Sequence, residues 1–139
     1  MDLVSQKKVL FLCIGNACRS QMAEGFAREL GADVMIPASA GLSPAISMPP
    51  LTIKVMKEKS ISVAEHFPKD ISFLRNIPFD LIINMSGKKV PPIYKAKIED
   101  WKVKDPMGKD EETYRTTRDD IEGRVKELVV AIRSGKFDT

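Results

Sequence analysis

The hydrophobic positions of the chain group into continuous apolar runs that alternate with stretches of helical spacing. The first run, in "KKVLFLCI" at residues 7–14, has the length and composition of a strand that is covered on both faces, as in a parallel sheet. Three later runs predict further strands: residues 33–41 ("DVMIPASAG"), 79–86 ("FDLIINMS") and 96–103 ("AKIEDWKV").

Helices are predicted between these strands and after the last of them. Apolar residues at helical spacing predict a helix from Ser20 to Leu30, and Pro49 and Pro50 suit the first turn of a second helix that ends near Lys59. Residues 67–76 predict a short helix. The longest helix is expected over residues 111–133, with an apolar face of Tyr114, Ile121, Val125, Leu128 and Ile132 and the outer charged pairs Glu111–Arg115, Asp120–Arg124 and Glu122–Lys126.

This alternation of strands and helices predicts an α/β fold. We expect a single doubly wound parallel sheet of four strands, with right-handed crossovers and helices on both faces. The chain has 139 residues and no linker or low-complexity segment, so it is expected to form one catalytic domain, residues 1–139. Ligands of such sheets bind beyond the carboxyl ends of the strands. Because Cys13 ends the first predicted strand, chemistry is expected there.

Composition and charge narrow the function classes. The net charge of +3 permits anionic substrates, but no basic stripe is interleaved with aromatic residues, so nucleic-acid binding is not expected. The start, "MDLVSQKK", lacks the apolar region of a signal peptide and no run reaches transmembrane length, so we expect a cytoplasmic protein without a membrane partner. Two cysteines and one histidine, His66, are a poor ligand set for a metal. No metal or other cofactor is expected, and His66 is interpreted as a surface residue without a role.

Both cysteines lie in the short segment "CIGNACRS", residues 13–20, which joins the first strand to the first helix. Successive backbone N–H groups in such a loop can converge on one point and form a nest for an anion, backed by the helix dipole. Gly15 is expected to give the turn its backbone freedom, and Asn16 tolerates left-handed geometry. The predicted oxyanion-binding loop comprises Ile14, Gly15, Asn16, Ala17, Cys18 and Ser20.

Two residues of this segment carry the expected chemistry. Arg19 offers a planar fork that can hold two oxygens of a tetrahedral oxyanion. Cys13, in that positive field, is expected to ionise to the thiolate, with the hydroxyl of Ser20 as a hydrogen-bond donor. These residues predict a nucleophile beneath a phosphate-shaped site. The plain alternative is a small buried cysteine beside a helix cap, but it leaves the glycine, asparagine, arginine and serine of the same eight residues unexplained.

The segment "CIGNACRS" resembles the signature loop of low-molecular-weight protein tyrosine phosphatases and of the arsenate reductases that share their fold. The resemblance covers nearly the whole chain: "CRSQMAEGFAR" and "DPMGKDEETYRTTRDDIEGRVKEL" are closer to the arsenate reductases, and "SAGLSP" is similar to both. It implies the phosphotyrosine phosphatase I-like fold with a flavodoxin-like strand order. It also implies Cys13 as the nucleophile and Arg19 as the oxyanion clamp.

Asp105, in "KVKDPMG", is the expected general acid and base. By itself an Asp-Pro pair is a turn signal. In the family that the sequence resembles, an Asp-Pro at this place carries the acid/base residue, so the resemblance implies that Asp105 protonates the leaving oxygen of a phosphate ester and then activates water. Phosphatases of this family often place tyrosines after the acid, whereas this chain reads "DPMG".

The cysteine pattern departs from one branch of the family. Thioredoxin-coupled arsenate reductases resemble this chain in the loop but use two more cysteines beyond the third strand, and here that region reads "NMSGKKVPPIYK". A reductase on this chain would finish its cycle through Cys18 or through an external thiol. Cys18 is either a small residue packed at the helix start or, as the resemblance implies, a redox partner that forms a reversible disulfide with Cys13.

Three functions remain open at this point. The first is a cysteine-dependent phosphomonoesterase that acts on a phosphorylated protein through a phosphocysteine. The second is an arsenate reductase with a thiol donor, because arsenate has the shape and charge of phosphate. The third is a non-catalytic module that binds a small oxyanion. We place the phosphatase first because Cys13, Arg19 and Asp105 are all that it requires, whereas the reductase lacks its usual resolving cysteines.

Overall fold

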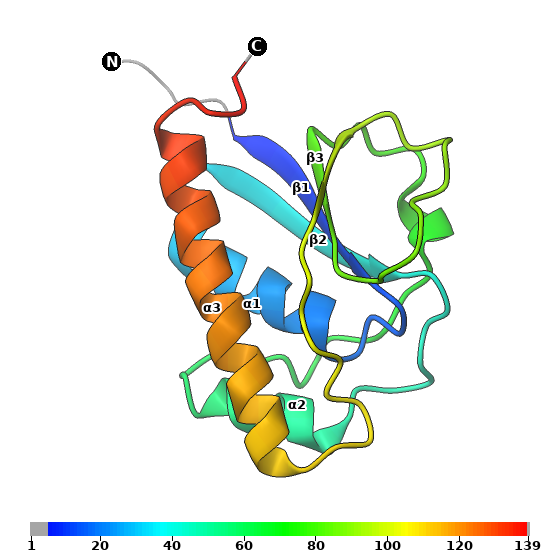
Figure 1. Ribbon diagram of the computed structural model, residues 1–139, viewed down its shortest axis with the longest axis vertical. Helices are drawn as coiled ribbons and strands as arrows, with labels where there is room; N and C mark the ends of the chain where they lie inside the picture. Colours follow the sequence, from blue (N-terminus) through cyan, green and yellow to red (C-terminus); the bar gives the residue numbers. More distant parts are fainter. Residues whose placement is uncertain (1–5, 139) are drawn as a thin grey trace.

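A parallel sheet of four strands in the order β2-β1-β3-β4 is the centre of the computed structural model (Figure 1), which describes residues 6–138. Residues 1–5 and 139 lie outside the described residues, so most of the stretch examined for a signal peptide is among them. In chain order the elements are β1 (Lys7–Cys13), α1 (Arg19–Gly31), β2 (Met35–Gly41), α2 (Pro50–Lys57), the 3₁₀ helix η1 (Ile71–Leu74), β3 (Leu81–Asn84), β4 (Lys97–Asp100) and α3 (Glu111–Arg133).

The strand order confirms the predicted fold. Strand β1 lies between β2 and β3, with Phe11 paired to Ser39 on one side and to Ile83 on the other. The chain leaves β1 toward β2 and returns on the opposite side to β3, so the strand order reverses at the carboxyl end of β1. Open α/β sheets bind their ligands at such a reversal. The loop that follows Cys13 therefore begins at the place where a site is expected.

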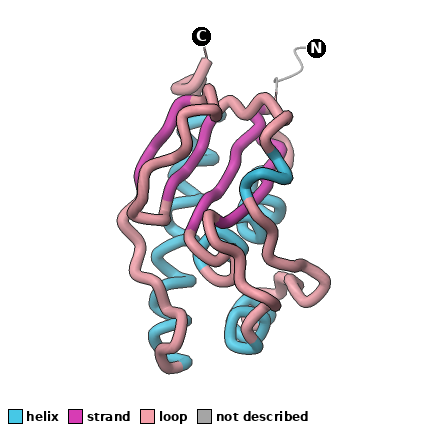
Figure 2. The backbone as a smooth tube through the Cα atoms, turned by 90° about the vertical axis from the view of Figure 1, so that its right-hand side faces the viewer, coloured by secondary structure: helices cyan, strands magenta, loops and turns pink. Residues whose placement is uncertain are grey.

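The two faces of the sheet are covered differently. Helices α1 and α3 pack on one face, where the larger group of buried apolar side chains lies; Figure 2 shows these helices behind the strands. The other face is covered by η1 and by irregular segments that contribute Ile71 and Phe79. The predicted short helix over residues 67–76 is thus a single 3₁₀ turn, Ile71–Leu74.

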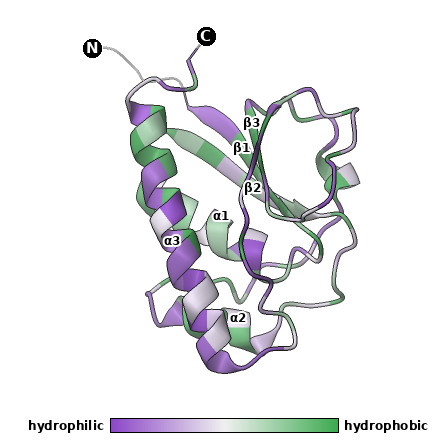
Figure 3. Cartoon of the chain, viewed as in Figure 1, coloured by the Kyte–Doolittle hydropathy of each residue, from purple (hydrophilic) through white to green (hydrophobic). Residues whose placement is uncertain are grey.

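Helix α3 has the predicted amphipathic pattern. All five residues of its predicted apolar face are buried, and Figure 3 shows the hydrophilic residues that alternate with them along the helix. The three predicted charged pairs are present as ion pairs at 2.8, 2.9 and 3.5 Å. Among residues 6–138, none of the helices combines the length and the apolar character that a membrane crossing requires.

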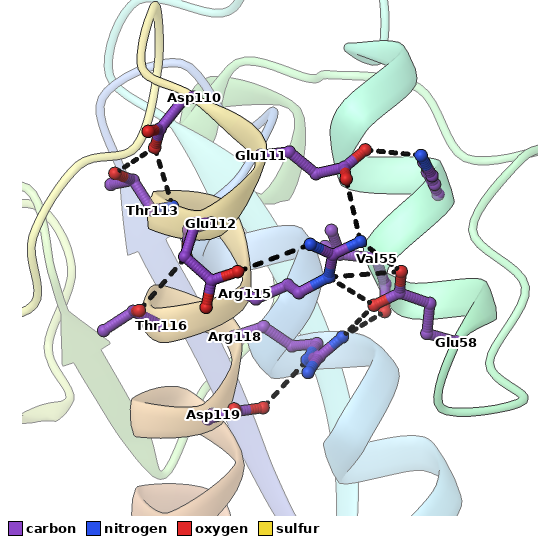
Figure 4. A network of polar contacts seen from close by, with 11 residues as sticks. Val55, Glu58, Asp110, Glu111, Glu112, Thr113, Arg115, Thr116, Arg118 and Asp119 are labelled. Carbon is purple, nitrogen blue, oxygen red and sulfur yellow. Dashed lines mark hydrogen bonds and ion pairs between the residues drawn. The ribbon is translucent and has the colours of Figure 1, made fainter.

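A cluster of charges fastens the end of α2 to the start of α3. Figure 4 shows Arg115 and Arg118 of α3 reaching Glu58, which follows α2, at 2.8 and 2.6 Å. Hydrogen bonds from Arg115, then from Arg118, lower the pKa of Glu58 to about 2, so this carboxylate is charged at neutral pH. Arg118 also donates to the backbone carbonyl of Val55 at 3.0 Å. These contacts hold the start of α3 against the end of α2. They thereby also help to position the segment that contains Asp105, because this segment leads directly into α3.

Candidate active site

A cavity of about 230 Å³ lies at the carboxyl end of β1. It brings together the nucleophile, the arginine and the acid that the sequence predicts, Cys13, Arg19 and Asp105. A larger cavity of about 600 Å³ lies beside β4, but no cysteine lines it. The smaller cavity is therefore the candidate site because of its lining residues, not because of its volume. The remaining lining residues are Ile14, Gly15, Ala17, Cys18, Ser43, Ala45 and Met107.

The backbone of the loop between β1 and α1 is arranged to receive an anion. The carbonyl groups of residues 13–15 accept hydrogen bonds of 2.8 to 3.1 Å from backbone N–H groups of the segment 42–45. Because a trans peptide directs its N–H opposite to its C=O, the N–H groups of residues 14–16 face away from that segment. Within the described part of the chain, the N–H groups of residues 14–19 have no hydrogen-bond acceptor, although Asn16, Ala17 and Cys18 are buried. Buried N–H groups require a partner, and an oxyanion in the cavity would supply one.

The left-handed residue of the loop is Asn16. Its φ is 50°, whereas Gly15, which the sequence suggests as the flexible residue of the turn, is not in the left-handed region. Asn16 tolerates this conformation because its short amide can form hydrogen bonds with nearby groups. Asn16 and Ser20 are fully buried and lie beneath the cavity instead of lining it.

Gly41, at the end of β2, is a site residue that the sequence analysis did not single out. A Cβ atom built at this position would lie 2.5 Å from the carbonyl oxygen of Ile14 and 2.9 Å from the backbone nitrogen of Asn16. No real Cβ atom approaches backbone atoms so closely, so only glycine lets the loop lie against β2. The small residues at the start of "SAGLSP", Ser39 to Gly41, are the sequence signal for this contact.

Hydrogen bonds hold the thiol group of Cys13 in place. Its Sγ lies 2.9 Å from the hydroxyl oxygen of Ser20, which itself accepts a hydrogen bond of 2.8 Å from the amide nitrogen of Asn16. With its oxygen accepting from Asn16, the hydroxyl of Ser20 has its proton available for the sulfur. A hydrogen-bond donor at this position stabilises a thiolate, which is the nucleophilic form of cysteine.

The guanidinium of Arg19 is almost completely buried and is held by backbone carbonyl groups. Its Nη1 donates to the carbonyl oxygen of Met85, just after β3, and to that of Val103 at 3.3 Å. Its Nη2 lies 3.5 Å from a carboxylate oxygen of Asp105. The Nε and Nη2 edge therefore remains for two oxygens of a bound oxyanion, a geometry that arginine supports through paired hydrogen bonds.

Asp105 lies at the rim of the cavity, in the irregular segment between β4 and α3. Its side chain is 49% exposed, and one carboxylate oxygen accepts a hydrogen bond of 3.1 Å from the backbone N–H of Met107. The segment is fixed to α3 by the hydroxyl of Thr117, which donates to the carbonyl oxygen of Lys104 at 3.3 Å. This position suits proton transfer to or from a group that enters or leaves the cavity.

Cys18 lies beside the same cavity, but its environment differs from that of Cys13. Its Sγ accepts from the hydroxyl of Thr52 at 3.5 Å and donates to the hydroxyl of Tyr114 at 3.7 Å. Burial, more than any other cause, raises the pKa of Cys18, so it is a thiol at neutral pH. Both cysteines are free. Within residues 6–138 no three His, Cys, Asp or Glu side chains gather in a way that could hold a metal ion.

Known proteins are similar to this chain over most of its length. The glutaredoxin arsenate reductase of Synechocystis sp. is 37% identical over 130 residues, which cover 91% of this chain and 98% of that protein. An arsenate reductase of Bacillus licheniformis is 36% identical over 88% of this chain and 95% of its own length. A solved structure described as an arsenate reductase in the phosphate binding state superimposes with a TM-score of 0.84 at 36% identity, over 91% of this chain and 99% of that one.

The family model described as low molecular weight phosphotyrosine protein phosphatase matches residues 8–136. That range includes β1 from Lys8 onward, the whole loop with Cys13 and Arg19, Asp105 and all of α3. It confirms the resemblance on which the sequence analysis drew. The chain therefore belongs to the low molecular weight phosphotyrosine protein phosphatase family.

Proposed function

We propose that this protein is an arsenate reductase that takes its electrons from an external thiol. The observation that carries the proposal is the combination of Cys13 in an oxyanion nest with similarity, over 91% of the chain, to a protein named as a glutaredoxin arsenate reductase. The nest does not separate arsenate from phosphate, because the two ions share shape and charge. The similarity to arsenate reductases favours arsenate as the substrate. We therefore place the reductase before the phosphatase, whereas the sequence analysis placed the phosphatase first.

The first step joins arsenate to the protein. The thiolate of Cys13 attacks arsenic, an S–As bond forms, and one arsenate oxygen leaves as water after it has been protonated. Arsenic remains As(V) in this adduct. The loop N–H groups and Arg19 stabilise the negative charge on the remaining oxygens, and Asp105 at the rim is placed to deliver the proton.

The second step transfers the electrons. A donor thiolate attacks Sγ of Cys13, an S–S bond forms, and the S–As bond breaks with its electron pair left on arsenic, which departs as arsenite, As(III). A second thiol then attacks the mixed disulfide, releases the donor as a disulfide and restores the Cys13 thiolate. Two thiols are oxidised for each arsenate reduced, so the electrons balance.

Two features favour an external thiol over Cys18 as the resolving group. The attacking species must be a thiolate, whereas burial raises the pKa of Cys18 and keeps it protonated. In addition, the segment after β3 reads Met85, Ser86, Gly87, without a cysteine that could relay a disulfide outward. The donor must therefore approach Cys13 through the cavity, whose lining includes Ala45 and Met107.

The experiment measures arsenite formed from arsenate by the wild type and by Cys18→Ser, with glutathione plus glutaredoxin or with thioredoxin as the donor. We expect turnover with glutathione plus glutaredoxin, and a rate in Cys18→Ser within about twofold of the wild type, well below the tenfold that 1.4 kcal/mol represents. Complete loss of turnover in Cys18→Ser would assign the resolving step to Cys18 and contradict the external thiol. Absence of arsenite with every donor would overturn the reductase itself.

A second candidate function, phosphomonoester hydrolysis, is favoured by the position of Asp105. Esters have poor leaving groups, and a carboxyl group 3.5 Å from Arg19 at the rim of the cavity is where a general acid would stand. An arsenate reductase makes a weaker demand on this residue, because solvent can help to protonate an oxygen that leaves as water. The two functions therefore differ in how strongly they depend on Asp105.

Asp105→Asn is expected to slow hydrolysis most for esters whose leaving groups are most basic. General acid catalysis contributes about 10²- to 10⁴-fold. The loss should approach that range for an alkyl phosphate, be smaller for an activated aryl phosphate, and be smallest for arsenate reduction. Asparagine keeps the oxygen that accepts from the N–H of Met107, so the turn is preserved. The measurement is kcat/KM of both proteins over a series of leaving groups.

The matched control is Asp110→Asn. Asp110 is also exposed and accepts from a backbone N–H, that of Thr113 at 2.9 Å, but it does not line the cavity. Its rates should follow those of the wild type throughout the series. An equal loss at every leaving group in Asp105→Asn would show that Asp105 is only a turn residue.

A further inference from the structure

The two edges of the sheet differ in what covers them. Strand β2 forms one edge and β4 the other. Along β2, Pro37 has no N–H, and its carbonyl oxygen accepts a hydrogen bond of 3.2 Å from Arg28. The N–H of Gly41, at the other end of β2, donates to the carbonyl oxygen of Lys69 at 2.9 Å. The outer edge of β2 is therefore occupied at both of these positions and offers no continuous row of groups to a further strand.

The outer edge of β4 is open. Trp101, which follows β4, donates its N–H to the carbonyl oxygen of Asn84 in β3 at 2.9 Å. Alternate residues of a strand direct their backbone groups to opposite sides, so Ile98 and Asp100 direct theirs away from β3. Within residues 6–138 the N–H and C=O groups of Ile98 and Asp100 have no hydrogen-bond partner. Such an edge is a template for another strand.

A cavity lies on each face of the sheet beside β4. Ile98 lines one of about 600 Å³, and Glu99, whose side chain points to the opposite face, lines one of about 330 Å³. The side chain of Ile98 is 44% exposed, although it is apolar. A strand added to β4 would direct its own side chains alternately over the two cavities. Sheet edges accept strands in this way, with backbone hydrogen bonds along the edge and space for alternate side chains.

The charges of β4 indicate which strand fits its edge. The strand reads Lys97, Ile98, Glu99, Asp100, with a cation at its start and two carboxylates at its end. Beside a parallel copy in register, every charge would lie opposite a like charge, which is destabilising. In an antiparallel copy the order is reversed, so the cation of one strand lies near the carboxylates of the other. The edge is therefore complementary to itself in the antiparallel direction.

The outward-facing groups allow three registers with two-fold symmetry. Hydrogen bonds must join outward-facing residues, so the axis passes through Ile98, Glu99 or Asp100. At Glu99 or Asp100, two carboxylates would lie directly opposite each other. At Ile98, the two isoleucine side chains meet, and Lys97 of each copy lies opposite Glu99 of the other.

We propose that two copies of this chain associate through β4 into one continuous sheet, with the two-fold axis at Ile98. Each copy presents the same surface to the other, as a two-fold interface requires. None of residues 97–100 lines the cavity that contains Cys13, so the interface does not use the candidate active site. The proposal is independent of the proposed function.

Sedimentation equilibrium measures the association and its dependence on charge. An edge of four residues belongs to the weak interfaces below about 1,200 Å², so the measurement extends to about 1 mM protein, where the wild type should form dimers. Glu99→Lys places lysines opposite each other and should weaken the dimer about tenfold, because the symmetry makes the substitution act twice. Adding Lys97→Glu restores opposite charges and should recover the wild-type affinity within about threefold. Glu29→Lys makes the same charge change at an exposed residue of α1 and should leave the affinity unchanged.

A disulfide cross-link tests the register. In a Cys13→Ser, Cys18→Ser background, Ile98→Cys places two thiols at a hydrogen-bonded pair with Cα atoms about 5.5 Å apart, so oxidation should give a covalent dimer. The control is Ile36→Cys on β2, which is 47% exposed in the wild type and should remain monomeric. A monomer at about 1 mM would overturn the proposal, as would equal cross-linking at both positions. The same holds for an affinity that Glu99→Lys does not change or that Lys97→Glu does not restore.

Discussion

Cys13→Ser is expected to abolish turnover while the protein still binds phosphate or arsenate. Serine keeps nearly the volume of cysteine, so the loop, its free N–H groups and Arg19 stay in place around the cavity. The hydroxyl does not ionise near neutral pH, so the nucleophile is lost and neither an arsenate adduct nor a phosphoenzyme can form. We expect no arsenite and no ester hydrolysis above the background rate.

Calorimetry with inorganic phosphate and with arsenate measures the binding that should remain. Cys18→Ser makes the same substitution at the other cysteine of the cavity and serves as the control for effects on folding. Its affinity for phosphate should match that of the wild type. Turnover by Cys13→Ser at the wild-type rate would exclude the covalent mechanism, and loss of oxyanion binding in this variant would show that the thiolate itself, not the nest, holds the ligand.

Arg19→Lys is expected to reduce kcat/KM about 10²- to 10³-fold, the effect of removing one preorganised donor from an oxyanion site. In the wild type, Nη1 donates to the carbonyls of Met85 and Val103, and Nη2 lies 3.5 Å from Asp105, so the Nε and Nη2 edge remains for a ligand in the cavity that Arg19 lines. An ammonium group is a single nitrogen and cannot serve both carbonyls and two ligand oxygens. Phosphate affinity should fall as well, because the clamp acts on the bound ion and on the transition state.

Arg28→Lys provides the comparison on the same helix. Arg28 also donates to a carboxylate, that of Glu24 at 2.9 Å, but it lies outside the cavity. Its kinetic constants should equal those of the wild type. If Arg19→Lys kept its activity within about twofold, far less than the tenfold that 1.4 kcal/mol represents, Arg19 would not be the clamp.

Much of the fold could be predicted because its signals are local. The apolar run that ends at Cys13, the helical spacing of 111–133 and the ion pairs on its outer side each lie within one short window, and all are present in the structure. That Cys13, the loop and Arg19 lie around one cavity was likewise predictable, because an anion nest needs consecutive residues at a strand end followed by a helix.

Other features could not be predicted because they depend on contacts between segments far apart in the sequence. That Asp105 lies beside Arg19 follows from the packing of β4 and α3, not from the Asp-Pro pair, which by itself indicates only a turn. The close approach of Gly41 to the loop depends on the pairing of β1 with β2. The backbone freedom of the loop was expected from Gly15, whereas the residue in the left-handed region is Asn16, which the sequence analysis had named as tolerant of that geometry.

The sequence by itself determined which groups are the candidates for the chemistry, since Cys13, Arg19 and the loop between them lie within one short segment. Only the tertiary structure decided the environment of these groups. Burial raises the pKa of Cys18, and the backbone of Lys69 fixes the orientation of Asn16 across more than fifty residues. The physical reason is that burial and the direction of a hydrogen bond are properties of whichever groups meet in space, and residue type and local spacing do not encode that meeting.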